Sequence, residues 1–278
     1  MLILSALCAT LKSRKILKGV KYTMALPKVI SHRGANKYAP QNTLAAFEKS
    51  VQIGVDGFET DVHITKDEQL VICHNYTIDE TSDGEGEISR MTLAQLKSYD
   101  FGSYFSPKYA GTRLPTLDEF LSFVETTDIS VLNIELKSPK ENETAIVRET
   151  IRLVKEHGLF DRLIISSFDP KLLVEAKTID EKCQTGFLYC PTRMNMWRDR
   201  LLKNYVPYAR SIGVDALHPH YAFVDEKYVE SAHEAGIKVN AWTVDSVKAI
   251  ENMINCKVDG IITNFPDVTN GLIDKHTY

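Results

Sequence analysis

The sequence predicts a (β/α)8 TIM barrel of the α/β class, with a small insertion after the second strand. Beyond residue 27, apolar runs of strand length alternate with longer stretches of helical pattern, and eight of each occur. Eight strand–helix units are the number that closes a parallel barrel. An open doubly wound sheet is the alternative, but we find no glycine-rich phosphate loop to support it. We therefore favour the closed barrel.

The elements alternate in a fixed order, with each strand followed by its helix. The predicted strands cover residues 28–32, 55–62, 130–137, 162–167, 184–189, 214–218, 237–243 and 258–263. The predicted helices cover about 42–53, 116–127, 142–157, 170–179, 196–212, 225–235, 245–254 and 266–275. Because such strands run parallel, the loops after them meet at one end of the barrel and build its active site.

Residues 64–113 interrupt this rhythm and are predicted to form an insertion between the second strand and its helix. The segment holds no long amphipathic helix and is rich in Gly, Asp and Ser. Asp61 and His74 lie symmetrically about Asp67–Glu68, so a hairpin turn there would return His74 beside Asp61. We expect the insertion to lie over the barrel mouth. The alternative is that it belongs to the core, with four apolar residues packed against the barrel: Leu93, Leu96, Tyr99 and Phe101.

Bulk properties indicate an ordinary globular protein that acts on small molecules. Of its 278 residues, 44% are apolar and 25% are charged, and the net charge is −4. This charge and the lack of a basic stripe argue against a nucleic-acid partner. Five cysteines are odd in number and have no CxxC spacing, which predicts reduced thiols and a cytoplasmic location. The oligomeric state cannot be inferred from the sequence.

Residues 1–27 are predicted to be an N-terminal extension, and residues 28–278 the barrel. Within 1–23, a mainly apolar run of 11 residues precedes a basic stretch. A signal peptide has the reverse order, and a spanning helix needs about 20 apolar residues. We therefore expect no stable membrane insertion, with export or membrane association through 1–23 as the less favoured alternative. Met24 is an alternative start.

Two acids on one strand give the strongest chemical signal. In the segment VDGFETDV (55–62), the period of two places Glu59 and Asp61 on one face and apolar or neutral residues on the other. Two adjacent carboxylates repel each other, and a divalent cation between them would relieve this repulsion. A solvated strand face is the plain alternative, but the strand is otherwise apolar. These acids therefore predict a metal site.

The segment LNIELK (132–137) supplies a third carboxylate. Asn133, Glu135 and Lys137 share one face of this strand. If both polar faces point into the barrel mouth, Glu135 completes an oxygen cage with Glu59 and Asp61. Three carboxylates suit Ca²⁺ or Mg²⁺ better than zinc, because no histidine or cysteine has zinc spacing. Lys137 would either balance charge or bind a phosphate oxygen.

Two histidines and an arginine complete the predicted site. His32 ends the first strand and His74 lies on the predicted hairpin, so they can flank a metal-bound phosphate as acid and base. Arg33 offers a planar fork for phosphate oxygens. Trp242 is either plain core or an aromatic surface at the mouth for a glycerol or choline group. Three further histidines could line the mouth and are weaker candidates: His63, His218 and His220.

Many ordered motifs resemble those of the glycerophosphodiester phosphodiesterase family, which is close in fold to phosphatidylinositol-specific phospholipase C. They are HRG, PxNT, GFETDVHITKD, the His74 region, RLPTLDEFL, NIELK, SSF, AWTVD and DGIITNFP, over about residues 28–268. The resemblance implies hydrolysis of glycerophosphodiesters to sn-glycerol 3-phosphate and an alcohol, with attack by the substrate's own hydroxyl and a cyclic phosphate intermediate. It also implies site residues: Glu59, Asp61 and Glu135 for the cation, His32 and His74 for acid/base work, and Arg33 and Lys137 for phosphate.

Three positions depart from the usual family pattern. Gln41, Asn75 and Asn264 each stand where the family usually has a carboxylate. Every proposed ligand and both histidines remain, so we expect activity, with efficiency, metal choice or substrate range as the properties open to change. Two alternatives stay open. One is a lysophospholipase D-like enzyme on lipid-bearing diesters, which needs an apolar cleft at the mouth. The other is a non-catalytic phosphoester-binding barrel.

Overall fold

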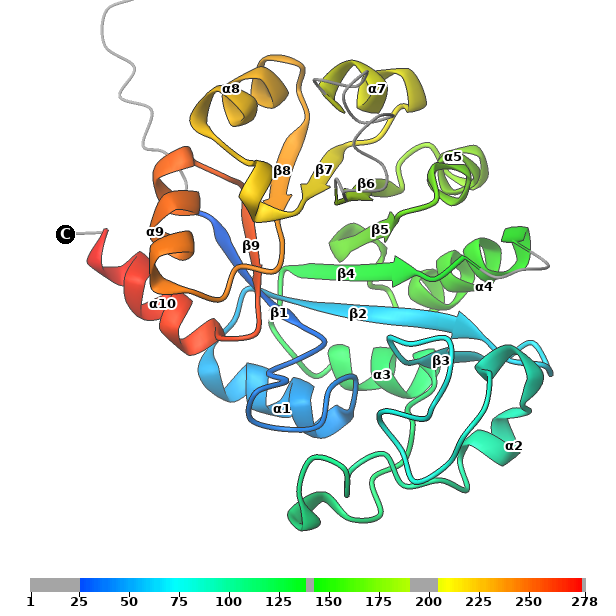
Figure 1. The fold of residues 1–278 in the computed structure, drawn as a ribbon. Coiled ribbons are helices and arrows are strands. Elements are labelled where there is room, and N and C mark those ends of the chain that lie inside the picture. Colours follow the sequence, from blue (N-terminus) through cyan, green and yellow to red (C-terminus); the bar gives the residue numbers. More distant parts are fainter. Residues whose placement is uncertain (1–25, 139–142, 191–204, 277–278) are drawn as a thin grey trace, which may run out of the picture.

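Eight parallel strands close into a barrel in the computed structural model, which describes residues 26–138, 143–190 and 205–276. Hydrogen bonds join neighbours in the order β1-β9-β8-β7-β6-β5-β4-β2, and β2 pairs with β1 to close the ring. This confirms the predicted TIM barrel (Figure 1). The strands are β1 (Lys28–His32), β2 (Gly57–Ile64), β4 (Val131–Leu136), β5 (Leu163–Ser167), β6 (Gln184–Tyr189), β7 (Ala216–Pro219), β8 (Lys238–Ala241) and β9 (Gly260–Thr263).

Helices surround this barrel and follow its strands in the chain (Figure 1). They are α1 (Leu44–Ile53), α3 (Leu117–Val124), α4 (Glu143–Glu156), α5 (Pro170–Ile179), α7 (Tyr205–Ile212), α8 (Glu226–Glu234), α9 (Val247–Cys256) and α10 (Pro266–Lys275). The first part of the helix predicted over 196–212 lies outside the described residues, as does most of the extension 1–27. None of the described helices is long and apolar enough to cross a bilayer.

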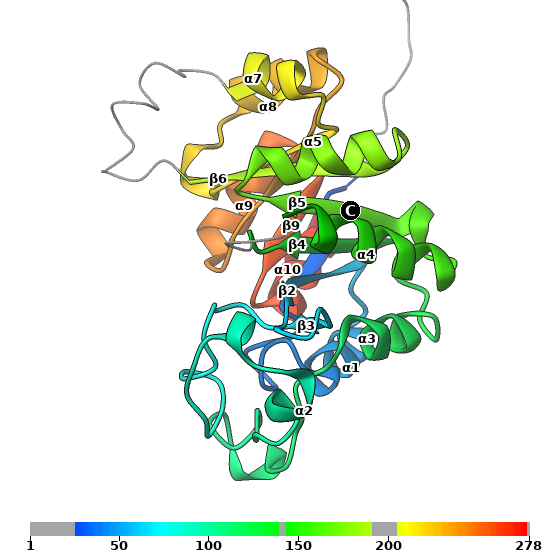
Figure 2. The same ribbon diagram turned by 90° about the vertical axis from the view of Figure 1, so that its right-hand side faces the viewer.

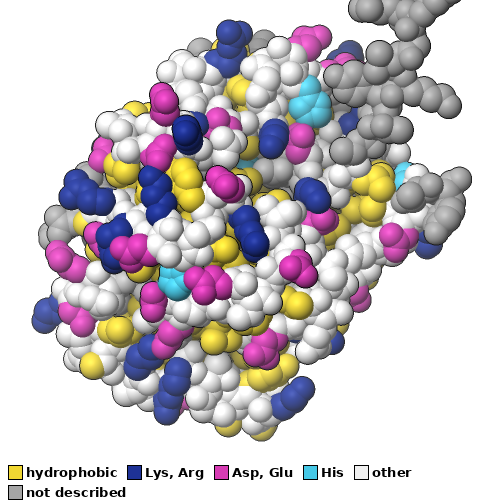
Figure 3. Space-filling model, turned by 180° about the vertical axis from the view of Figure 1, so that it is seen from behind, with side chains coloured by type: hydrophobic (Ala, Val, Ile, Leu, Met, Phe, Trp, Pro, Cys, Tyr) yellow, Lys and Arg dark blue, Asp and Glu magenta, His cyan; other side chains and the backbone are white. Residues whose placement is uncertain are grey.

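The main hydrophobic core lies between the strands and the surrounding helices. Outward-facing strand residues meet helix residues there, as in the contact of Phe58 with Phe47 of α1 and Phe120 of α3. The opposite strand faces point into the barrel and carry the polar residues of the site, so the period of two separates packing from chemistry. On the outer face seen in Figure 3, acidic and basic side chains are interspersed.

Helix α1 begins two residues later than predicted, and this difference matters for the site. Asn42 has φ +55°, in the left-handed region, and cannot belong to a right-handed helix. Thr43 is the N-cap instead, and its hydroxyl accepts a hydrogen bond from the N–H of Ala46. The side chain of Asn42 is thereby directed towards the barrel rather than along the helix.

A Val-Asp pair recurs just before three strands, at 55–56, 214–215 and 258–259. These pairs lie at the amino ends of the strands, which we call the lower end of the barrel. Each aspartate accepts a backbone N–H from a neighbouring strand, and each contacts a basic side chain. The N–H groups belong to Val29 (2.9 Å), Thr185 (2.8 Å) and Val239 (2.8 Å). The basic side chains are Lys28 (2.8 Å), Lys177 (2.7 Å) and His233 (2.8 Å). These bonds fix the strand register opposite the mouth.

The insertion begins as the predicted hairpin, with its register shifted by one residue. Strand β3 (Leu70–Ile72) pairs antiparallel with β2 through Val62 and Ile72, so Asp61 lies opposite Cys73 rather than His74. The reason is a turn of three residues, 66–68, whose last residue, Glu68, has φ +58°. A three-residue turn of this kind centres the hairpin on a residue and not between two.

The rest of the insertion forms a lobe beside the barrel (Figures 1 and 2). It contains η1 (Ile88–Arg90), α2 (Leu93–Leu96) and η2 (Pro107–Tyr109). Its buried apolar residues form a small core separate from the main one: Val71, Cys73, Ile78, Ile88, Leu96, Phe101 and Leu114. Leu96 and Phe101 are therefore core residues, as the alternative reading expected, but of the lobe and not of the barrel. The domain division at 64–113 stays a prediction.

The role of the lower aspartates is testable by stability. Asp259→Ala should lower the free energy of unfolding by about 1–3 kcal/mol, because the N–H of Val239 loses its acceptor. The exposed Asp274→Ala on α10 is the matched control and should change little. Urea denaturation followed by circular dichroism measures both. Equal stability of the two variants would contradict the assigned role.

Candidate active site

Three carboxylates meet on the inward faces of β2 and β4, as the strand pattern predicted. The two strands pair with Asp61 opposite Glu135, and Glu59 lies two residues before Asp61 on the same face. One oxygen from each carboxylate lies within 4.8 Å of the others. All three side chains are buried, with 4%, 0% and 8% of their surface exposed. The set matches the donors that a hard divalent cation prefers.

The electrostatics of the cluster favour additional positive charge. Burial and the neighbouring acids raise the pKa of Glu59 well above its usual value, and burial raises the pKa of Glu135 to about 7. Burial alone would also raise the pKa of Asp61, but Lys137 and Arg33 outweigh it and hold that pKa far below its usual range. Two of the three carboxylates thus favour protonation, and a bound cation would favour their ionised forms instead.

Lys137 is the closest cation to the cluster. Its Nζ lies 2.8 Å from Asp61 Oδ1 and 2.5 Å from Glu135 Oε1, and the side chain is buried. Burial favours the neutral amine, but these two carboxylates outweigh it and raise the pKa of Lys137. The structure therefore shows the charge-balancing arrangement that was one of its two predicted roles.

Arg33 is held against the cluster by the turn after β1. Its backbone has φ +56°, and its N–H donates to Glu59 Oε2 at 2.8 Å. Gly34 must be glycine, because a Cβ there would lie 2.7 Å from the Cβ of Ala46. The guanidinium donates from Nη1 to Gln41 Oε1 at 2.6 Å, and its Nε lies 3.6 Å from Asp61 Oδ2. Gln41, one of the three departures, thus tethers Arg33 through a neutral acceptor.

Asn42 is a residue that the sequence reasoning missed. Its Nδ2 donates to Asp61 Oδ2 at 2.9 Å, and its Oδ1 accepts from the Thr60 hydroxyl at 2.9 Å. It therefore fixes the orientation of Asp61 from behind. The PxNT motif marked the position, but nothing in the local pattern shows which side chain an asparagine before a helix will contact.

Nδ1 of each candidate histidine lies within hydrogen-bond distance of an asparagine oxygen. His32 Nδ1 lies 2.7 Å from Asn264 Oδ1, and His74 Nδ1 lies 2.6 Å from Asn75 Oδ1. Burial, together with the charge of Arg33, lowers the pKa of His32 to about 3. Burial also lowers the pKa of His74, against the opposing effect of Asp61. His32 is therefore neutral near pH 7, and Nε2 of neither ring is engaged by these asparagines.

Six of the eight predicted site residues line a single cavity of about 190 Å³. Asp61 and Lys137 lie directly behind it, in contact with its wall. The six residues are His32, Arg33, Glu59, His74, Glu135 and Trp242. The structure therefore brings all eight together.

The opposite wall of this cavity is apolar. Phe168, Leu188, Trp242 and Ile262 line it, and the rings of Phe168 and Trp242 meet edge to face at 5.6 Å. The indole N–H of Trp242 donates to the carbonyl of His218 at 2.7 Å, which fixes the ring. The predicted strand 237–243 included Trp242. In the structure β8 ends at Ala241, so Trp242 lies just after the strand.

Asn133 lines the same cavity and was not assigned a role from the sequence. Its side chain is buried, with 1% exposed, and neither its Oδ1 nor its Nδ2 has a hydrogen-bond partner among the described residues. It pairs in register with Glu59, which pairs in turn with His32. An amide so placed offers one donor and one acceptor to a bound molecule.

The three weaker histidines do not line the cavity. His63 Nε2 lies 3.4 Å from the carbonyl of His74, so it supports that loop from below. His218 is fully buried inside the barrel, with Nε2 3.0 Å from Asn240 Nδ2. His220 stacks on Tyr221, and its Nδ1 accepts the N–H of Ala222.

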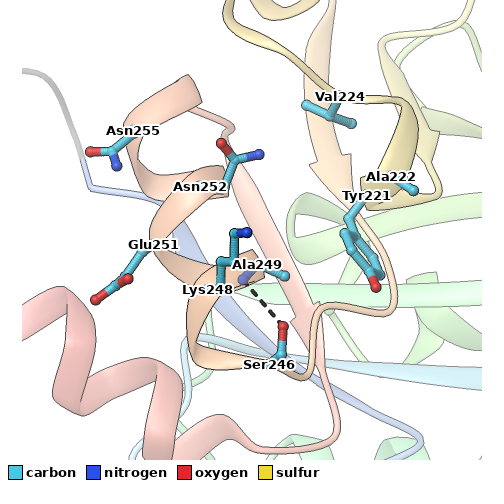
Figure 4. Close-up of a pocket in the computed structure, with 9 residues that line it drawn as sticks. All are labelled: Tyr221, Ala222, Val224, Ser246, Lys248, Ala249, Glu251, Asn252 and Asn255. Atoms are coloured by element: carbon cyan, nitrogen blue, oxygen red, sulfur yellow. Dashed lines mark hydrogen bonds between the residues drawn. The ribbon is translucent and has the colours of Figure 1, made fainter.

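A larger hollow of about 570 Å³ lies elsewhere, between η4 (Tyr221–Phe223) and α9. Figure 4 shows the nine residues that line it, where Ser246 caps α9 by accepting the N–H of Ala249. Its only charged lining residues are Lys248 and Glu251, and no histidine is among the nine. It offers neither an acid/base pair nor a carboxylate cluster, so the smaller cavity is the candidate site.

Comparison with known proteins identifies the family of this chain. The model of the glycerophosphoryl diester phosphodiesterase family matches residues 32–268. The chain belongs to this family. It is 38% identical over 248 residues to a glycerophosphodiester phosphodiesterase of Caldanaerobacter subterraneus subsp. tengcongensis, which covers 89% of this chain and 98% of that protein. The family resemblance predicted from the motifs is confirmed, and with it the class of phosphoric diester hydrolase.

Solved structures of glycerophosphodiester phosphodiesterases share this fold. One is a phosphodiesterase of Oleispira antarctica in complex with the product sn-glycerol-3-phosphate. It is 30% identical to this chain, with a TM-score of 0.79, and the match covers 90% of this chain and 97% of that one. Another is a glycerophosphodiester phosphodiesterase of Parabacteroides distasonis, which is 26% identical, with a TM-score of 0.75, over 91% of this chain and 98% of that one. The family likeness therefore extends over nearly the whole barrel.

The support that Asn42 gives to Asp61 leads to a prediction about metal affinity. Asn42→Ala should weaken binding of Ca²⁺ or Mg²⁺ by about 10–100-fold, the usual cost of losing an outer partner of a ligand. Isothermal titration calorimetry measures it. Asn36→Ala, on the same loop but without a contact to the carboxylates, is the control. Unchanged affinity in Asn42→Ala would show that Asp61 needs no such support.

Proposed function

We propose that this protein is a divalent-cation-dependent glycerophosphodiester phosphodiesterase, which hydrolyses glycerophosphodiesters to sn-glycerol 3-phosphate and an alcohol. The observation that supports it most is the convergence of a carboxylate cluster, two histidines and an arginine on one cavity. Glu59, Asp61 and Glu135 would hold the cation, for which Ca²⁺ and Mg²⁺ are the candidates. Bound there, the cation would offset charge on the phosphoryl oxygens and lower the pKa of the attacking hydroxyl.

The charges of the cluster fit a cation and a phosphodiester together. Three ionised carboxylates with Arg33 and Lys137 carry a net charge of −1. A divalent cation would change this to +1, which one phosphodiester anion neutralises. Arg33 faces the cavity and can bind the phosphate with the N–H groups that Gln41 does not use. Lys137 would approach the phosphate only if it leaves one of its carboxylates.

The two histidines would transfer protons on either side of the phosphate. We assign the base role to His32, because burial beside Arg33 lowers its pKa and keeps its ring neutral, the form that can accept a proton from the glycerol hydroxyl that attacks phosphorus. The charge of Asp61 favours the protonated form of His74 instead. His74 would protonate the leaving alcohol. In the second step the roles reverse, as water opens the cyclic phosphate.

The shape of the cavity favours small substrates. A volume of about 190 Å³ suits a glycerol phosphate, whose carbon atoms can lie on the apolar wall around Trp242. The unpartnered amide of Asn133 can accept from and donate to a substrate hydroxyl. An acyl chain would have to lie outside, over Phe168, which is 48% exposed. This exposed ring is the observation that keeps lysophospholipase D-like activity as the second candidate.

The proposed setting is the cytoplasm, in glycerol and lipid metabolism. Support comes from the cysteines, since no disulfide joins two of them within the described residues. The expectation of no nucleic-acid partner rests on the sequence alone.

Metal removal tests the carboxylate cage. EDTA should abolish release of sn-glycerol 3-phosphate from a panel of glycerophosphodiesters, and Ca²⁺ or Mg²⁺ should restore it. Glu59→Gln and Asp61→Asn should both weaken metal binding. The thermal midpoint should hold or rise in Glu59→Gln, because burial and the neighbouring acids disfavour the charge of Glu59. It should fall in Asp61→Asn, because Lys137 and Arg33 stabilise the charge of Asp61. Full turnover in chelator would refute the cage.

The histidine roles separate by leaving group. His32→Ala and His74→Ala should each lower kcat by about 10²–10⁴ on glycerophosphoethanolamine, the usual contribution of a positioned acid or base. A glycerophosphodiester of p-nitrophenol has a leaving group that needs no proton, so it should rescue His74→Ala much more than His32→Ala. Equal losses on both substrates would mean that the pair does not work as acid and base.

A further inference from the structure

Each site histidine is joined to an acid through an asparagine. His32 meets Asn264 Oδ1, and Asn264 Nδ2 donates to Asp245 Oδ2 at 2.7 Å. His74 meets Asn75 Oδ1, and Asn75 Nδ2 donates to Glu80 Oε2 at 2.8 Å. Asn264 and Asn75 are two of the three departures from the usual family pattern. In each case the histidine contacts the asparagine, and a carboxylate lies on the far side of that asparagine, one hydrogen bond away from it.

These acids determine which way each amide faces. An ionised carboxylate only accepts hydrogen bonds, so it must meet the NH₂ group of the asparagine. For Asn264, a second contact agrees, because Asn36 Nδ2 donates to its Oδ1 at 2.5 Å. The amide oxygen is therefore directed at His32 Nδ1. Since that oxygen only accepts, Nδ1 must carry the proton and Nε2 must be the free nitrogen.

We infer that Asp245 and Glu80 are positioning residues, which act through Asn264 and Asn75 to hold His32 and His74 in the Nδ1–H tautomer. Nε2 of each imidazole is then left to take or give the proton in catalysis. When Nε2 gains a proton, the Nδ1–H bond stays as it was, so the ring need not turn between steps. This inference deepens the proposed function, because it rests on acid/base roles for the two histidines.

The two hydrogen-bonded chains, from His32 to Asp245 and from His74 to Glu80, differ in strength. Asp245 is half-buried and accepts three hydrogen bonds, from the N–H and Nδ2 of Asn264 and from the Thr263 hydroxyl. Glu80 is exposed, and its contact with Asn75 lies at the surface of the insertion lobe. Water competes more strongly with the second contact than with the first. The tautomer of His32 should therefore depend more on its acid than that of His74.

The test exchanges acid and amide. Asp245→Asn keeps the shape but removes the acceptor-only group, so Asn264 is free to turn and present its NH₂ to His32. The fraction of the Nδ1–H tautomer of His32 should fall, and kcat should fall by about 10–100-fold with little change in KM. The paired exchange, Asp245→Asn with Asn264→Asp, again gives His32 an acceptor-only partner. It should restore the tautomer and most of kcat.

Imidazole ¹⁵N shifts in protein labelled at histidine report the tautomer directly and do not depend on turnover. His32→Ala and His74→Ala assign the signals. Asp267→Asn is the matched control, because this acid bonds the Tyr38 hydroxyl and contacts neither histidine chain. Glu80→Gln should shift the His74 signal by less than Asp245→Asn shifts that of His32.

Two results would overturn the inference. One is a folded Asp245→Asn protein with the wild-type tautomer of His32. The other is a folded exchange variant that recovers neither tautomer nor kcat; this variant also decides the matter if Asp245→Asn alone fails to fold. A wild-type protein that hydrolyses no glycerophosphodiester would refute the proposed function instead, while the ¹⁵N shifts would still test the positioning.

Discussion

The burial of three carboxylates within 4.8 Å of one another is the constraint on which the rest of the site depends. Such a group is unstable without compensation, since each charge is both desolvated and repelled. The surrounding residues supply that compensation in different ways. Lys137 provides charge, the N–H of Arg33 provides a dipole, and Asn42 provides a neutral donor. The left-handed turn after β1 directs the N–H of Arg33 at Glu59, and the late start of α1 directs the side chain of Asn42 at Asp61.

The three amides that stand where the family usually has carboxylates also affect the balance of charge around the cavity. Had Gln41, Asn75 and Asn264 been carboxylates, the surroundings of the cavity would carry three more negative charges, close to the site of an anionic substrate. As amides they keep the hydrogen bonds to Arg33, His74 and His32 without that charge. For Asn75 and Asn264, an acid lies one hydrogen bond further from the histidine, at Glu80 and Asp245. Geometry is thus kept while the electrostatic potential in the cavity becomes less negative.

The sequence was sufficient for whatever follows from strand periodicity. Glu59, Asp61 and Glu135 could be grouped because alternation fixes their faces and parallel strands share one mouth. The hairpin register was wrong by one residue, because the conformation of Glu68 decides between a two-residue and a three-residue turn. The repeated aspartates at the lower end were also missed, although Val-Asp recurs in the sequence.

Side-chain contacts that do not follow from strand periodicity could not be predicted. Asn42 and Asp61, Asp245 and Asn264, and the partners of the lobe core are joined only by the folded chain. A side-chain amide has no periodic pattern that reveals its partner, since it donates and accepts equally well. Asn133 shows the same limit: its face was known from the strand, but only the folded structure shows that it has no hydrogen-bond partner among the described residues.

The two histidines reach the cavity from different structural units, and this has a consequence for catalysis. His32 belongs to β1 of the barrel, whereas His74 follows β3 and belongs to the hairpin that leads into the lobe. Their separation therefore depends on how the lobe rests on the barrel. Polar contacts cross that junction: the Tyr104 hydroxyl accepts the N–H of Gln41, and the Tyr109 hydroxyl donates to the carbonyl of Tyr38. An ion pair also joins Lys97, which follows α2, to Glu119 of α3. Because Gln41 also tethers Arg33, movement of the lobe would alter the acid/base pair and the phosphate contact together.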